Sequence, residues 1–147
     1  RVAHLRLSPN VFTCNAAISA CEKGGQWQLA LLLLDRFTSL RLSPNVVTCS
    51  AAISACENGG RWRLALHLLG RVAHLRLSPN VFTCNAAISA CEKGGQWQLA
   101  LLLLDRFTSL RLSPNVVTCS AAISACENGG RWRLALHLLG RVAHLRL

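Results

Sequence analysis

The side chains best suited to chemistry in this chain are its cysteines, and their spacing argues against a disulfide or a metal site. They form four Cys-x6-Cys pairs, so the members of a pair lie two helical turns apart on one face. At about 1.5 Å of rise per residue the partners are roughly 10 Å apart, too far for a disulfide or a shared metal ion. We therefore predict buried, reduced thiols that act as small apolar residues. The eight cysteines are Cys14, Cys21, Cys49, Cys56, Cys84, Cys91, Cys119 and Cys126.

The carboxylates and histidines are spaced equally poorly for catalysis. Glu22 and Glu57 each stand singly before a Gly-Gly pair, so no two carboxylates are placed for acid–base work. His67 and His74 lie seven residues apart with no carboxylate nearby, which indicates surface or inter-helix residues. We expect no catalytic residue, no metal site and no cofactor.

A second set of side chains suits recognition better than reaction. Phe12, Asn15, Ser19 and Glu22 are spaced three, four and three residues apart, so they line one face of a helix. An amide offers both a donor and an acceptor, whereas a hydroxyl is a small polar group that leaves room for a larger ring. These residue types recur along the chain, which favours reading a polymer one unit at a time.

The elements that position these side chains form an internal repeat. Residues 1–70 recur without change as residues 71–140, and residues 141–147 begin a third copy. A finer period of 35 residues is marked by Leu-Ser-Pro-Asn at positions 7, 42, 77 and 112. The structural unit is therefore 35 residues long.

Each unit reads as two helices. Asn10 is placed to cap a first helix, which must end at Gly24-Gly25. A second helical pattern starts near Gln26, and Pro44 closes it. So short a connection makes the helices pack antiparallel as a hairpin. The apolar stripes are Val11, Cys14, Ala17, Ile18 and Cys21 in the first helix and Trp27, Ala30, Leu31, Leu34 and Phe37 in the second.

The apolar run Leu29–Leu34 leaves the second helix without a polar face, so it needs neighbours on more than one side. Stacked hairpins supply them, and we predict an all-α fold, an α-solenoid of antiparallel helical hairpins. An array without capping repeats is also expected to associate end to end. The predicted units are 1–10 (the tail of an upstream repeat), 11–45, 46–80, 81–115 and 116–147.

Charge and hydropathy limit the partners. The chain has 16 Lys plus Arg against 6 Asp plus Glu, and 14 of the 16 cations are arginine, which suits planar contacts with phosphates and bases. A basic surface that only maintains solubility is an equally good explanation of the charge. The longest apolar run, Leu29–Leu34, is far short of the roughly 20 residues that span a bilayer, so we expect no membrane contact.

The period and the motifs together resemble the pentatricopeptide repeat family. Tetratricopeptide units have 34 residues and HEAT units are longer, whereas this unit has 35 residues with Ser-Pro-Asn before the first helix. The resemblance rests on residues 11–21 (VFTCNAAISAC), Gly24-Gly25, Leu29-Ala30-Leu31 and Pro44-Asn45, in register four times. Two features depart from the family pattern. Cysteine replaces tyrosine at the fourth position of the first helix (Cys14, Cys49, Cys84, Cys119), and asparagine replaces the final aspartate (Asn45, Asn80, Asn115).

The resemblance implies a right-handed superhelix that binds single-stranded RNA, one base per repeat. In the family, the fifth residue of the first helix and the last residue of the motif select a base, and second-position side chains of adjacent repeats sandwich it. Under the family's pairing rules Asn/Asn favours a pyrimidine and Ser/Asn favours adenine, which predicts 5′-pyrimidine-A-pyrimidine-3′, followed by a purine. The implied base-selecting residues are Asn15 with Asn45, Ser50 with Asn80, Asn85 with Asn115, and Ser120; the sandwiching residues are Phe12, Val47, Phe82 and Val117.

Candidate phosphate contacts are Lys23 and Lys93 beside the Gly-Gly turn, and Arg61 and Arg131 at the start of the second helix. Arginines that lie over the neighbouring tryptophans are an equally good interpretation of the last two. The resemblance further implies a non-enzymatic role in RNA processing, stability, editing or translation in mitochondria or plastids, without a small-molecule substrate. A peptide-binding scaffold of the tetratricopeptide type and a structural segment of a longer array stay open as alternatives.

Overall fold

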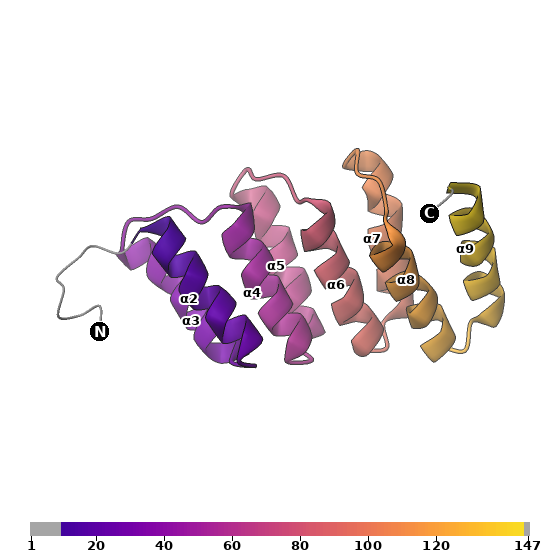
Figure 1. Ribbon diagram of the computed structural model, residues 1–147, viewed down its shortest axis with the longest axis horizontal. Coiled ribbons are helices and arrows are strands. Elements are labelled where there is room, and N and C mark those ends of the chain that lie inside the picture. The colour runs from indigo at the N-terminus through magenta and orange to yellow at the C-terminus, as the bar shows by residue number, and fades with distance from the viewer. Residues whose placement is uncertain (1–9, 146–147) are drawn as a thin grey trace.

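The computed structural model describes residues 10–145, which form a row of four antiparallel helical hairpins (Figure 1). Residues 1–9 of the predicted upstream tail (residues 1–10) lie outside the described residues, as do residues 146–147. We call the first helix of each hairpin helix A and the second helix B. The A helices are α2 (Val11–Lys23), α4 (Val46–Asn58), α6 (Val81–Lys93) and α8 (Val116–Asn128). The B helices are α3 (Trp27–Ser39), α5 (Trp62–His74), α7 (Trp97–Ser109) and α9 (Trp132–Leu145).

Both ends of helix A lie where the residues predicted them. The Asn10 side chain accepts a hydrogen bond from the Thr13 backbone N–H and so caps α2. At the other end, Gly25 has a φ of 70°, a region that glycine reaches without steric cost. The Gln26 N–H donates to the Cys21 carbonyl at 2.8 Å, which closes the helix with a Schellman turn.

Helix B ends at Ser39, earlier than the end that was predicted from Pro44. The Leu42 N–H donates to the Phe37 carbonyl at 2.8 Å, which closes a second Schellman turn. Its left-handed residue is Arg41, with a φ of 57°. Because glycine is the usual signal for this turn, an arginine gave no indication that the helix stops at Ser39. Arg76 and Arg111 have the same conformation.

The hairpins stack so that the A helices form one layer and the B helices another (Figure 1). Successive A helices pack against each other, and each B helix packs against its own A helix. The first three B helices, α3, α5 and α7, also pack against the next A helix. Alanine, serine and cysteine let the A helices come close together, while Leu34 and Phe37 fill the space between the layers. These contacts confirm the predicted all-α solenoid of antiparallel hairpins.

The cysteines belong to this packing. Six of them, in α4, α6 and α8, are buried, while Cys14 and Cys21 in α2 are half-buried. All eight are free thiols. Burial raises the pKa of the Cys56 and Cys91 thiols to about 11, so both stay protonated and unreactive near neutral pH.

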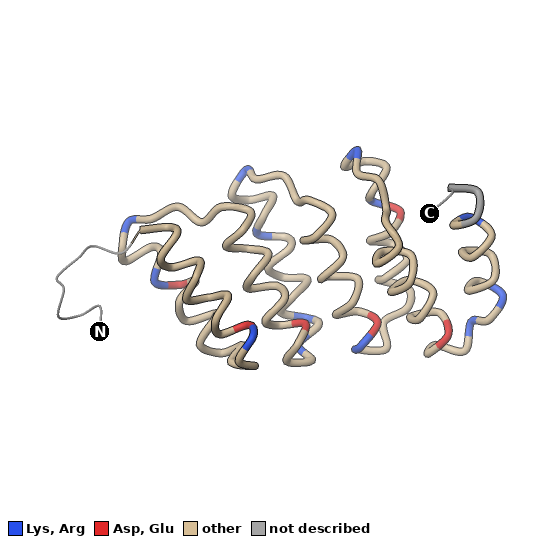
Figure 2. Tube along the Cα trace, viewed as in Figure 1, with Lys and Arg blue, Asp and Glu red and all other residues tan. Residues whose placement is uncertain are grey.

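None of the described helices is both long and apolar enough to cross a membrane. Over the same residues, no group of three or more His, Cys, Asp and Glu side chains is placed to hold a metal ion. Charged residues gather at the two edges of the layer of A helices (Figure 2). The middle of each A helix carries no charge, so the charged residues of helix A lie in its last turn.

Candidate functional site

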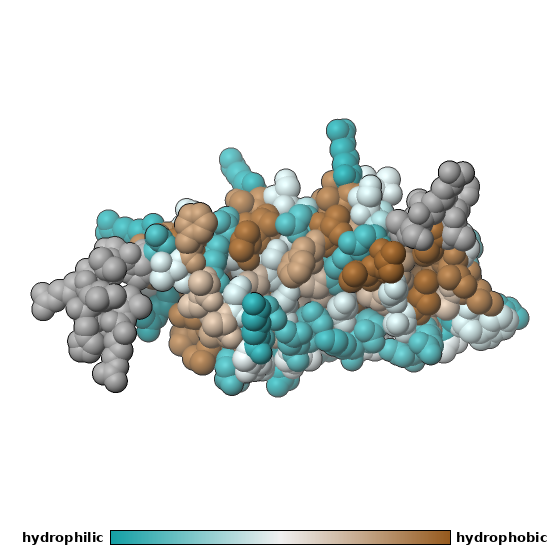
Figure 3. All heavy atoms as spheres, in the orientation of Figure 1, coloured by the Kyte–Doolittle hydropathy of each residue, from teal (hydrophilic) through white to brown (hydrophobic). Residues whose placement is uncertain are grey.

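The layer of A helices presents an apolar side chain at the second position of every repeat. Phe12 and Phe82 are 84% and 61% exposed, and Val47 and Val117 are exposed as well. Such large apolar side chains are normally buried. Figure 3 shows apolar patches recurring along this face, with hydrophilic residues gathered along its lower edge. These four second-position residues are the ones that the resemblance predicted to sandwich bases.

Two hollows lie between these second-position side chains. One has a volume of about 270 Å3 and is lined by Glu22, Val47, Ser50, Asn80 and Phe82, among others. The next has a volume of about 370 Å3 and is lined by Glu57, Phe82, Asn85, Asn115 and Val117, among others. Each hollow therefore combines one predicted base-selecting pair with its two predicted sandwiching side chains. Phe82 forms a wall of both.

The predicted Asn/Asn pairs are in direct contact. Asn15 Nδ2 donates to Asn45 Oδ1 at 3.2 Å, and Asn85 Nδ2 donates to Asn115 Oδ1 at 3.1 Å. Asn15 is only 8% exposed because the next repeat covers its side chain. Asn15 lies on the helix face that was predicted to serve recognition, and its contact with Asn45 explains why so little of it is exposed.

The Ser/Asn pair is linked through a third residue that the sequence did not indicate. Ser50 Oγ lies 2.6 Å from Thr83 Oγ1, and the Thr83 hydroxyl donates to Asn80 Oδ1 at 2.7 Å. The equivalent threonines, Thr48 and Thr118, contact Asn15 and Asn85. The only sequence signal for them was a threonine three residues after each capping asparagine. Ser120, in the last repeat, is exposed.

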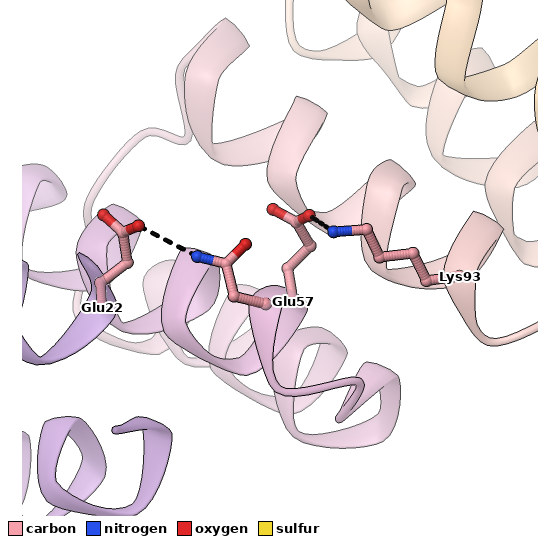
Figure 4. Close-up of polar contacts among 4 residues, drawn as sticks. Glu22, Glu57 and Lys93 are labelled. Carbon is pink, nitrogen blue, oxygen red and sulfur yellow. Dashed lines mark hydrogen bonds and ion pairs between the residues drawn. The ribbon is translucent and has the colours of Figure 1, made fainter. Parts of the chain in front are cut away.

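The lysines lie beside the turns between helices A and B. Lys93 forms an ion pair with Glu57 of the preceding repeat, and Asn58 Nδ2 donates to Glu22 Oε2 at 3.0 Å in the equivalent place (Figure 4). A phosphate would have to compete with Glu57 for Lys93. Lys23 is exposed.

The arginines at the start of helix B lie on tryptophan rings. The Arg61 guanidinium lies 4.8 Å from the centre of the Trp27 ring, which belongs to the preceding repeat. Arg131 lies over Trp97 in the same way, at 4.9 Å. Neither arginine lines the two hollows. This geometry favours the interpretation in which both pack on tryptophan over the one in which they bind phosphate.

The fold and the row of hollows define an α-solenoid whose repeats present equivalent side chains at regular intervals. The family model for the pentatricopeptide repeat domain matches residues 2–59, 32–95 and 67–131. The chain therefore belongs to the pentatricopeptide repeat family. No curated protein sequence matches it.

Solved structures show the same fold. The chain is similar to maize PPR10 (25% identity, TM-score 0.73) and to PPR10 in complex with an 18-nt psaJ RNA element (19% identity, TM-score 0.86). It is also similar to the PPR domain of Arabidopsis thaliana protein-only RNase P 1 in complex with tRNA (10% identity, TM-score 0.83). Each match covers 99% of this chain, 77% of the RNase P domain and 21–22% of PPR10. The chain thus spans about a fifth of the maize protein.

Proposed function

We propose that this array binds single-stranded RNA selectively, one base per repeat, in the order 5′-pyrimidine-A-pyrimidine-3′, followed by a purine. The observation that carries the proposal is the pair of hollows that share Phe82. Each has apolar walls at its two ends and a polar pair between them. A flat base would stack on the walls and use its edge for hydrogen bonds.

Val47 and Phe82 would hold adenine beside Ser50 and Asn80, because the small serine leaves room for a purine. Phe82 and Val117 would hold a pyrimidine beside Asn85 and Asn115. By the same pairing, Asn15 and Asn45 would read the first base. The family and its RNA-bound structural relatives support this assignment, and the family points to RNA processing, stability, editing or translation in an organelle.

Fluorescence anisotropy with labelled oligoribonucleotides tests the proposal. We expect the pyrimidine-A-pyrimidine element to bind more tightly than the same element with its adenine replaced by cytosine, and equal affinities would contradict the base assignment. Phe82→Ala should weaken binding roughly 5- to 150-fold, the equivalent of about 1–3 kcal/mol for a lost stacking contact. Phe12→Ala is the matched control, and it should cost less because Phe12 lies at the first predicted base only.

A peptide-binding scaffold is the second candidate, favoured by a groove between α5 and α7. This groove is lined mainly by leucines, including Leu66, Leu69, Leu99 and Leu102. Raising the salt concentration distinguishes the two functions. RNA affinity should fall steeply with salt because bound counterions are released, whereas apolar peptide binding should hardly change.

A further inference from the structure

Three threonines at the third position of α4, α6 and α8 join each repeat to the one before it. Thr48, Thr83 and Thr118 are fully buried, and each hydroxyl contacts the fifth-position side chain of the preceding repeat. A hydroxyl carries one proton and two lone pairs. The direction in which that proton points therefore determines what the fifth-position residue can offer a ligand.

In the Asn/Asn site the helix cap fixes the direction. The Thr48 backbone N–H donates to Asn45 Oδ1 at 3.0 Å, which sets the orientation of the Asn45 amide. Asn15 must then turn its Nδ2 toward that oxygen, since two carbonyl oxygens in contact would repel each other. Its own Oδ1, which can only accept, lies 2.6 Å from Thr48 Oγ1. The Thr48 hydroxyl also lies 3.0 Å from Asn45 Oδ1, so its one proton goes to the nearer oxygen, that of Asn15.

In the Ser/Asn site the hydroxyl points the other way. The Thr83 backbone N–H donates to Asn80 Oδ1 at 2.8 Å, and the Thr83 hydroxyl donates to the same oxygen. The amide oxygen of Asn80 can only accept, whereas Ser50 Oγ, 2.6 Å from Thr83 Oγ1, can either donate or accept. Both contacts of Thr83 therefore hold a proton when Thr83 donates to Asn80 and Ser50 donates to Thr83. In this arrangement Ser50 is the donor to Thr83, and only the serine lone pairs remain available.

The two sites consequently offer different groups to a ligand. Asn15 and Asn45 keep free amide N–H groups, which suit the carbonyl oxygens of a pyrimidine. Ser50 and Asn80 offer one acceptor beside amide donors, which suits the 6-amino group and ring nitrogen of adenine. We propose that the third-position threonine is a positioning residue that determines, through its proton, whether the preceding repeat presents an acceptor. This inference rests on the proposed RNA-binding function.

Substitution of Thr83 tests the inference in RNA binding. Unsubstituted purine lacks the 6-amino group of adenine. The wild type should therefore bind an element with adenine at the second base roughly 3- to 10-fold more tightly than one with purine there, the range for one neutral hydrogen bond. Thr83→Val frees the Ser50 proton, so this ratio should fall below about 2-fold, while Thr83→Ser should retain it. Selectivity at the third base, beside Thr118, should not change.

A measurement without RNA separates this inference from the proposed function. In the free protein, the Asn15 side-chain amide protons should exchange with water faster in Thr48→Val than in Thr48→Ser or the wild type, as read by nuclear magnetic resonance. Unchanged exchange overturns the inference, as does a Thr83→Val protein that binds RNA with the wild-type ratio. A wild type that binds none of the oligonucleotides overturns the proposed function, and the exchange rates still test the role of the threonine. Thr83→Ala replaces Thr83→Val if circular dichroism shows that the latter does not fold.

Discussion

Replacing Gly94 with alanine should weaken the contact between the second and third repeats. Gly94 ends α6 with a φ of −88°, which any residue adopts, so alanine is not strained there by its backbone. A Cβ at this position would lie 2.7 Å from Cγ of Trp62, a separation at which the ring must move. The substitution therefore tests whether Trp62 packs against the end of the next A helix.

Gly24 provides a matched control in the same chain. Residues 10–45 and 80–115 are identical in sequence, and Gly24 has a φ of −86°. The nearest described atom to a Cβ there is the Ala20 carbonyl oxygen at 3.3 Å. Intrinsic effects of alanine should therefore cancel between the two variants, and the displaced tryptophan should cost Gly94→Ala about 1–3 kcal/mol more than Gly24→Ala.

Urea unfolding followed by far-ultraviolet circular dichroism measures the difference. We expect a lower midpoint for Gly94→Ala than for Gly24→Ala. In a double variant with Trp62→Leu, the penalty at Gly94 should shrink, because the side chain that it displaces is gone. Equal midpoints for the two glycine variants would refute the packing argument.

Four further predictions rest on the fold. Arg76→Gly should raise the free energy of unfolding by about 0.5–1 kcal/mol, because glycine adopts the φ of 59° without the steric cost of a Cβ; a lower urea midpoint would count against this. Alkylation should label the half-buried Cys21 faster than the buried Cys91. Burial raises the Cys91 pKa from 9.0 to about 11 in the folded state, so the unfolded chain loses this proton at a lower pH than the folded protein does. The melting temperature should therefore fall between pH 9 and 11, and a constant melting temperature would contradict the pKa shift. Glu57→Gln should lower the free energy of unfolding by no more than about 1 kcal/mol, since the Lys93 side chain of the ion pair is 46% exposed. A larger loss in urea unfolding would contradict this estimate.

The sequence was sufficient for the fold because its signals act locally. Asn10 and Gly25 mark the ends of α2 through bonds within a few residues of each other. The exact recurrence of the unit then requires every hairpin to stack in the same way. The end of helix B could not be predicted, because Arg41 occupies a backbone region that the usual signals assign to glycine.

The candidate site was only partly predictable because it is shared between repeats. The resemblance identified Asn15 and Asn45, and their proximity follows once the repeats stack. The contact of Thr48 with Asn15 spans 33 residues, and no spacing within one helix points to it. For the same reason Arg61 was expected beside Trp62 but lies over Trp27, since stacking brings the start of one B helix against the preceding one.

If the array binds RNA as proposed, the hydrogen bonds between repeats would couple base choice to the stability of the stack. Within the described residues, every buried side-chain nitrogen or oxygen atom has a hydrogen-bond partner. A base in either hollow could bond to the remaining amide protons or serine lone pairs without breaking a bond that joins two repeats. RNA would therefore meet a preorganised surface, which reduces the entropy that binding costs.

Substitution of a proposed base-selecting residue, by contrast, would break a hydrogen bond that joins two repeats. Asn15→Ser would remove the amide that bonds to Asn45. The Thr48 hydroxyl would then have to donate to Asn45, the arrangement inferred for Thr83 and Asn80. Because such a bond contributes about 0.5–1.5 kcal/mol, we expect this variant to lower stability as well as to change base preference. A threonine hydroxyl has one proton and two lone pairs, so it can either donate to the fifth-position residue or accept from it. The array can therefore alternate its two kinds of repeat.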